Sequence, residues 1–105
     1  MRRGEVWWAR LPLPAGRRPV VLISRDDAYV VRRKVTVAEV STVVRAIPSE
    51  VALRKSDGMP RPCVINADNL VTIPKSLLES KIVSLGESLI EELDAALMFS
   101  LGLDA

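Results

Sequence analysis

An arginine pair stands at the start of a strongly apolar run, in the segment Gly16-Arg17-Arg18-Pro19-Val20-Val21-Leu22-Ile23. Proline fixes its own φ and restricts the residue before it to extended geometry, so Arg18 is expected at the entrance of a buried strand. A guanidinium stays protonated at any working pH, and its planar fork can bind two phosphate oxygens at once. The segment therefore predicts a preorganised cation at Arg18, and two interpretations are open for it: a phosphate-binding group, or a solvated or ion-paired loop arginine.

Two adjacent hydroxyl side chains, Ser41 and Thr42, end a second run rich in β-branched residues, which is typical of a strand over residues 35–42. Two interpretations are open for them: hydroxyls that satisfy backbone groups at a strand end, or donors to a bound phosphate. Arg45, a little further along, either holds a phosphate or is solvated. Trp7 and Trp8 point to opposite sides of a regular strand, so one is expected in the core while Trp8 is the candidate for stacking on a base, although core packing also suits both.

The residue types that the chain lacks narrow its chemistry. It contains no histidine and a single cysteine, Cys63. It therefore has neither the commonest general acid or base nor the commonest metal ligand, and it can form no internal disulfide. We expect no metal and no cofactor, and Cys63 is interpreted as a small core residue.

Length and composition indicate one domain over residues 1–105, because 105 residues with 49% hydrophobic content suit a single core. The net charge of +2 is too small to identify a nucleic-acid partner by itself. Basic residues are concentrated in the first 61 positions, and the charged residues within 79–104 are mostly acidic. No apolar run reaches the length of a membrane span, so a cytoplasmic protein is expected.

The expected elements are several short strands followed by one helix, which favours a small, strongly curved barrel over a βαβ sheet. Strands are predicted at residues 4–11, 19–24, 35–42 and 70–73, and a hairpin from 50–54 and 63–66. A turn is predicted at Asp68 and Asn69, and a helical turn at 74–78. The final helix is expected to begin with a capping box of Ser84 and Glu87 and to end at Gly102.

In the order of its motifs the chain resembles the MazF/PemK family of toxin ribonucleases, the endoribonucleases of bacterial toxin–antitoxin pairs. The resemblance covers nearly the whole chain. The matching segments are residues 4–8 (GEVWW), 18–24 (RPVVLIS), 40–42 (VST) with Arg45 and 48–51 (PSEV), 68–75 (DNLVTIPK), and 97–103.

The resemblance implies a mainly β fold with a C-terminal helix, an SH3-like barrel of the kind shared with the gyrase poison CcdB. It implies a homodimer that cleaves single-stranded RNA in a sequence-specific manner without a metal, and a cognate antitoxin whose disordered tail lies across the RNA groove. The family's active-site arginine falls on Arg18. Its threonine falls on Ser41, with Thr42 as the adjacent hydroxyl, and RNA contacts are expected from Arg17, Arg45 and Trp8.

The chain departs from the family in two places. The loop before Arg18 carries no acidic residue, which leaves the general base unassigned. Glu39 stands two residues before Ser41, on the same side of an ideal strand, and is either a substitute base or a solvated carboxylate. Two other functions stay open: a CcdB-like gyrase poison without catalysis, and a small barrel that binds RNA or peptide without cleaving. The chain ends without the tryptophan that CcdB relatives carry on their last helix.

Overall fold

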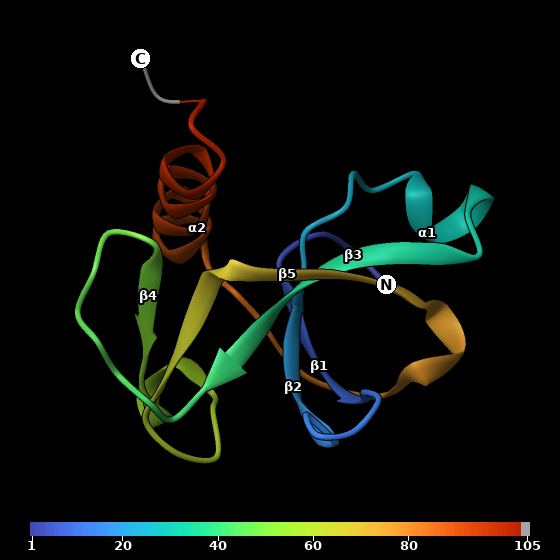
Figure 1. Ribbon diagram of the computed structural model, residues 1–105, viewed down its shortest axis with the longest axis horizontal. Coiled ribbons are helices and arrows are strands. Elements are labelled where there is room, and N and C mark those ends of the chain that lie inside the picture. Colours follow the sequence, from blue (N-terminus) through green and yellow to red (C-terminus); the bar gives the residue numbers. More distant parts are fainter. Residues whose placement is uncertain (104–105) are drawn as a thin grey trace.

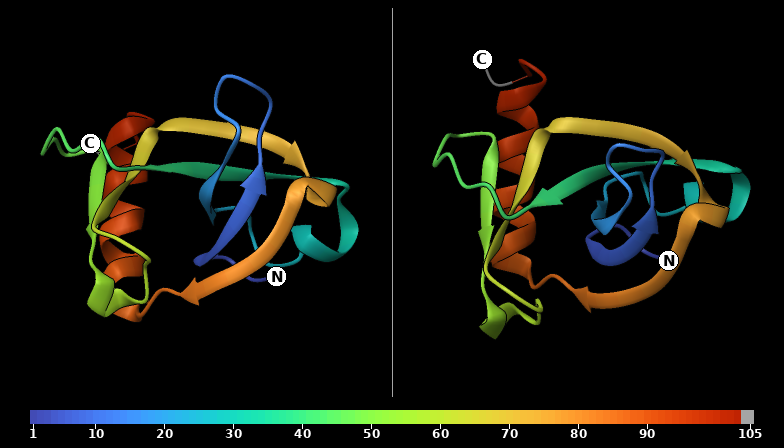
Figure 2. Two further views of the ribbon diagram at one scale, coloured as in Figure 1. Left: turned by 90° about the horizontal axis from the view of Figure 1, so that it is seen from below. Right: turned by 60° about the horizontal axis from the view of Figure 1, so that its bottom comes forward.

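Across residues 1–103, which the computed structural model describes, the chain forms one curled sheet and a C-terminal helix. The elements in chain order are β1 (Glu5–Arg10), β2 (Arg17–Leu22), α1 (Ala28–Val31), β3 (Lys34–Ser41), β4 (Glu50–Leu53), the 3-10 turn η1 (Lys55–Asp57), β5 (Cys63–Pro74), the 3-10 turn η2 (Lys75–Leu77), β6 (Leu78–Ser84) and α2 (Glu87–Ser100). The strands follow the order β4-β5-β3-β2-β1-β6, with antiparallel neighbours throughout. Figures 1 and 2 show the sheet curling on itself while α2 lies beside β4 and β5. The expected mainly β barrel with a terminal helix is confirmed.

Alternating residues of the central strand β3 supply both halves of the core. Ala38 and Val40 belong to the half that α2 covers, and Leu93 of α2 is fully buried there. Val35 and Val37 point to the other half, which includes Tyr29 of α1. β3 therefore carries buried apolar side chains on both faces, interrupted by Thr36 and Glu39. β3 and its neighbour β2 are thereby held between two packed layers.

Strand β5 runs without interruption from Cys63 to Pro74, so the turn predicted at Asp68 and Asn69 is wrong. The register against β3 shifts between Ala38, which pairs with Leu70, and Glu39, which pairs with Asn66. The extra residues form a bulge. Ser49 stabilises it, because its carbonyl accepts from the amide of Ala67 at 2.8 Å and its hydroxyl donates to Asp68 at 2.6 Å. Asp68, one of the two polar residues that suggested a turn, is thus bonded to the loop before β4.

Two further corrections concern the segments that flank the barrel. Ser84 ends strand β6 opposite Glu5, and α2 begins after Gly86, so the predicted capping box does not form. The segment between β2 and β3, for which the sequence analysis predicts no element, contains the short helix α1, which buries Ala28 and Tyr29. The predicted helix end at Gly102 is confirmed, since Gly102 has a φ of +69° and its amide donates to Phe99. No helix within residues 1–103 has the length and apolar content needed to cross a membrane.

Candidate functional site

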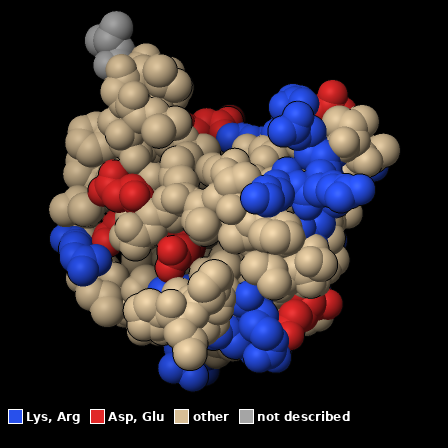
Figure 3. Space-filling view, turned by 45° about the vertical axis from the view of Figure 1, so that its right-hand side comes forward, with Lys and Arg blue, Asp and Glu red and all other residues tan. Residues whose placement is uncertain are grey.

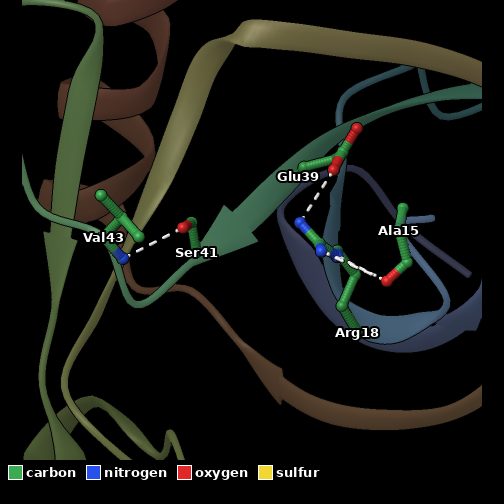
Figure 4. Close-up of polar contacts among 5 residues, drawn as sticks. All are labelled: Ala15, Arg18, Glu39, Ser41 and Val43. Atoms are coloured by element: carbon green, nitrogen blue, oxygen red, sulfur yellow. Dashed lines mark hydrogen bonds and ion pairs between the residues drawn. The ribbon is translucent and has the colours of Figure 1, made fainter.

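Arg18 lies near the start of β2, and its guanidinium is held from two sides (Figure 4). Nε and Nη2 donate to the carbonyl of Ala15 at 3.3 and 3.2 Å, and Nη1 donates to Oε1 of Glu39 at 3.1 Å. A guanidinium carries five N–H groups, so one on each Nη remains available to a ligand. The side chain is 34% exposed. The predicted preorganised cation is therefore present, fixed by its own loop and by a neighbouring strand.

Glu39 is an ion-pair partner of Arg18, so the interpretation of Glu39 as a solvated carboxylate is wrong. Its side chain is only 21% exposed. The ion pair forms because of the register between β2 and β3. Val20 lies directly opposite Glu39, so Arg18, two residues before Val20, is the diagonal neighbour of Glu39 on the same face of the sheet. The chain thus brings a carboxylate to this arginine from β3, although the loop before Arg18 has none.

Ser41 ends β3, and its hydroxyl already has one partner (Figure 4). Its Oγ accepts from the amide of Val43 at 3.0 Å. Because this bond uses a lone pair, the O–H of Ser41 remains free to donate. Both interpretations of this serine are compatible with the geometry: it satisfies a backbone group and retains a donor. Thr42, the adjacent hydroxyl, is exposed.

Arg18 and Ser41 border one cavity of about 510 Å³. Its walls come from β1, the start of β2, the end of β3 and the loop between β4 and β5. The lining residues are Trp8, Arg17, Arg18, Pro19, Val40, Ser41, Thr42, Val43, Met59, Pro60, Arg61 and Cys63. Among residues 1–103, this lining contains three arginines and two hydroxyl side chains and no carboxylate. Such a concave, cationic site with hydrogen-bond donors suits a phosphate-bearing ligand.

Arg17 and Trp8 form one wall of the cavity together. The guanidinium carbon of Arg17 lies 4.3 Å from the centre of the Trp8 ring, and its Nε donates to Glu79 at 2.7 Å. Hydrogen bonding from Arg17 and then Arg10 lowers the pKa of Glu79, although partial burial opposes the shift. Trp8 therefore lies at the cavity with Arg17 over one face, while Trp7 is partly buried against the half of the core that contains Val35.

Two arginines lie where the sequence analysis did not place them. Arg45 is exposed in the loop after β3 and does not border the cavity; only its backbone amide is bound, to Glu50 at 2.9 Å. Arg61 borders the cavity and was missed by sequence reasoning. The available signal was its position between Pro60 and Pro62, which restricts the backbone on both sides of a cation.

The basic run at residues 32–34 lies at the other end of β3 from Ser41. Lys34 and Ser41 are the two ends of this strand and lie seven residue steps apart, a distance of roughly 23 Å at about 3.3 Å per residue. Figure 3 shows basic side chains gathered over the end of the molecule that carries α1 and the start of β3. Arg32, Arg33 and Lys34 are exposed and belong to a surface separate from the cavity.

Comparison with known proteins supplies a second line of evidence. The sequence model of a family described as PemK-like, MazF-like toxin of type II toxin-antitoxin system matches residues 2–101. The probable endoribonuclease MazF5 of Mycobacterium tuberculosis is 38% identical over 86 residues, covering 81% of this chain and 78% of that protein. The probable endoribonuclease MazF2 of the same species is 33% identical over 103 residues, covering 97% and 99%.

Solved structures agree over the whole barrel. One is an endoribonuclease in complex with its cognate antitoxin from a mycobacterial species, with a TM-score of 0.89 and 27% identity over 100% of this chain and 98% of that one. Another is the Mycobacterium tuberculosis toxin MazF-mt6, with a TM-score of 0.87 and 31% identity over 96% and 99%. The likeness extends to the strands and loops that enclose the cavity.

Proposed function

Because this chain belongs to the PemK-like, MazF-like family of toxins of type II toxin-antitoxin systems, we propose that it cleaves single-stranded RNA at the cavity beside Arg18 and Ser41. The chain is an endoribonuclease toxin, as its relatives are named. The observation that carries the assignment of the site is the joint presence of Arg18 and Ser41, from neighbouring strands, at one cationic cavity.

The reaction proposed is attack of the ribose 2′-hydroxyl on its own phosphate. The bond from the 2′-oxygen to phosphorus forms, and the bond from phosphorus to the 5′-oxygen of the next nucleotide breaks. The 2′-proton passes to a base, and the departing 5′-oxygen takes up a proton. The products are a 2′,3′-cyclic phosphate and a 5′-hydroxyl end, and neither an enzyme nucleophile nor a metal is required.

Arg18 stabilises the charge that gathers on the non-bridging oxygens in the transition state. The two N–H groups that remain free after its bonds to Ala15 and Glu39 are available for this, so the guanidinium need not leave either partner when a phosphate binds. Ser41 donates its free O–H to a non-bridging oxygen, with the hydroxyl oriented by the amide of Val43. Preorganised donors of this type lower the barrier without reorganisation during the reaction.

Glu39 is the proton acceptor in this proposal: it does not itself line the cavity, but it is ion-paired with Arg18, which does. It is the carboxylate in contact with Arg18, and it shares a strand face with Ser41, two residues further along β3. The chain has no histidine to take this role. A base must be close to the proton that it removes, and the ion pair holds Glu39 beside the group that binds the phosphate.

The wider setting follows from the family. The toxin acts in the cytoplasm as a homodimer, recognises a short RNA sequence, and is neutralised by a cognate antitoxin. A related endoribonuclease has been seen bound to its cognate antitoxin, which supports the last point. The apolar and basic surface around the cavity suits an acidic, amphipathic peptide segment.

The test is incubation of the purified protein with a long single-stranded RNA in EDTA, followed by mapping of the new ends. Discrete cuts with cyclic phosphate ends are expected. Arg18→Ala should lower the cleavage rate by about a hundredfold or more, equivalent to about 3 kcal/mol, while Arg33→Ala, at the far end of β3, should not. If the wild-type protein leaves the RNA intact, the proposal is overturned. Intact RNA together with impaired gyrase would favour a gyrase poison, and intact RNA that stays bound to the protein would favour a binding module.

A further inference from the structure

Arg61 borders the same cavity as Arg18, from the loop that joins β4 to β5. Two buried side chains anchor this loop, since Met59 is 4% exposed and Cys63 is 6% exposed. Between them, Pro60 has a fixed φ, and Pro62 restricts Arg61 to extended geometry. The backbone that carries this cation is therefore constrained at both ends, so ligand binding need not order the loop itself.

The three arginines of the cavity differ in their partners. Arg17 is paired with Glu79 at 2.7 Å, and Arg18 is paired with Glu39 at 3.1 Å. Within residues 1–103, no ion pair or side-chain hydrogen bond engages Arg61, which is exposed. A phosphate that approaches Arg61 has no carboxylate to displace. It meets a guanidinium whose donors are all free for charge-assisted bonds.

We propose that Arg61 forms a second phosphate-binding subsite, which holds an RNA backbone phosphate adjacent to the one cleaved beside Arg18. This subsite rests on the proposed nuclease function. A cavity of about 510 Å³ is of the size that holds one small ligand, so one nucleotide lies between the two arginines with a phosphate at either end. RNA then runs from β2 across the cavity to the loop between β4 and β5.

The two arginines accordingly have different effects on catalysis. Arg18 contacts the phosphate whose charge changes during the reaction, so its loss lowers kcat. Arg61 contacts a phosphate that is the same in substrate and transition state, so it supplies uniform binding and its loss raises KM with kcat nearly unchanged. Because a backbone phosphate carries no sequence information, the loss of Arg61 weakens binding to all RNA sequences alike.

The experiment compares Arg61→Ala, Arg61→Lys and Arg33→Ala with the wild type. Arg33 is the matched control, because it is an exposed arginine that lies far from the cavity and forms no ion pair with any residue in the described part of the chain. Arg61→Ala should raise KM by roughly tenfold, the effect of about one charge-assisted hydrogen bond, and leave kcat within about twofold. Arg61→Lys should recover part of the binding, since it keeps the charge but loses the fork.

Salt dependence gives a readout that a merely structural role would not move. Binding is measured with a single-stranded RNA oligonucleotide in the slowly cleaving Arg18→Ala background, with and without Arg61→Ala, over times short compared with cleavage. Loss of one phosphate contact should reduce the slope of log K against log salt by about 0.7, and Arg61→Lys should restore it. Arg33→Ala should leave the slope unchanged.

The outcomes separate the two proposals. If the wild type cleaves RNA while Arg61→Ala has the KM and salt slope of Arg33→Ala, the subsite is refuted and the nuclease function stands. A fall in kcat at unchanged KM would also refute the subsite, because Arg61 would then act at the reacting phosphate. If the wild type leaves RNA intact, the proposed function itself is wrong.

Discussion

Replacement of Glu39 by glutamine tests the proton acceptor directly. Glutamine keeps an oxygen that can accept the hydrogen bond now made at 3.1 Å from Nη1 of Arg18, but it loses the negative charge and the ability to take up a proton. The variant therefore separates two contributions of one side chain: holding the guanidinium and receiving the 2′-proton. Glu39→Ala removes both.

The two contributions differ in size. The ion pair is partly exposed, with side chains 34% and 21% accessible, and pairs in such surroundings contribute up to about 1 kcal/mol, less than a tenfold change in rate. General base catalysis contributes about a hundredfold to ten-thousandfold. We therefore expect Glu39→Gln to lower the cleavage rate by about a hundredfold or more, and Glu39→Ala to lower it further.

The assay is single-turnover cleavage of an end-labelled RNA in EDTA at neutral pH. Glu91→Gln, on the exposed face of α2, is the control and should cleave at the wild-type rate. A Glu39→Gln rate within about tenfold of wild type, together with a larger loss in Glu39→Ala, would show that Glu39 only positions Arg18.

Three further predictions concern the hydroxyl and the two halves of the core. Ser41→Thr keeps the O–H and should cleave RNA within a few-fold of wild type, whereas Ser41→Ala should lose about a hundredfold in the same assay; equal losses would remove the hydroxyl from the mechanism. Leu93→Ala empties a fully buried site under α2 and should lower the free energy of unfolding in urea by about 2–5 kcal/mol, and a loss below about 1 kcal/mol would mean that α2 is not packed as described. Burial and then Asp26 raise the pKa of Tyr29 to about 12 from its usual 10.0, so the ultraviolet titration of this single tyrosine should occur near that value. Its contribution to stability should be complete below pH 10 and decrease as the pH rises towards 12, while a titration near 10 would contradict its burial.

Effects between residues adjacent in the sequence explain much of the local structure of the site. Pro19 restricts Arg18 by a steric effect that acts between neighbours, and the apolar run that follows produces the buried strand β2. The hydroxyl at Ser41 follows from the end of a β-branched segment. These features depend on local geometry and on the alternation of side chains along a strand, so the sequence alone predicted the cation, the hydroxyl and the strands that carry them.

Other features depend on residues far apart in the chain. Asp68 and Asn69 have the composition of a turn, yet the contact with Ser49 makes them a bulge inside β5. Glu39 becomes the partner of Arg18 only through the register of β2 against β3, and Arg61 reaches the cavity only through the closure of the barrel.

The sequence by itself thus determined which groups could bind a phosphate, because the chemistry of a side chain and the steric restriction from an adjacent proline depend only on the residue and its neighbours in the chain. Only the tertiary structure decided which of those groups share a cavity and which arginine remains unpaired there. Strand register and loop closure depend on the packing of the whole core, so they cannot be read from any single segment.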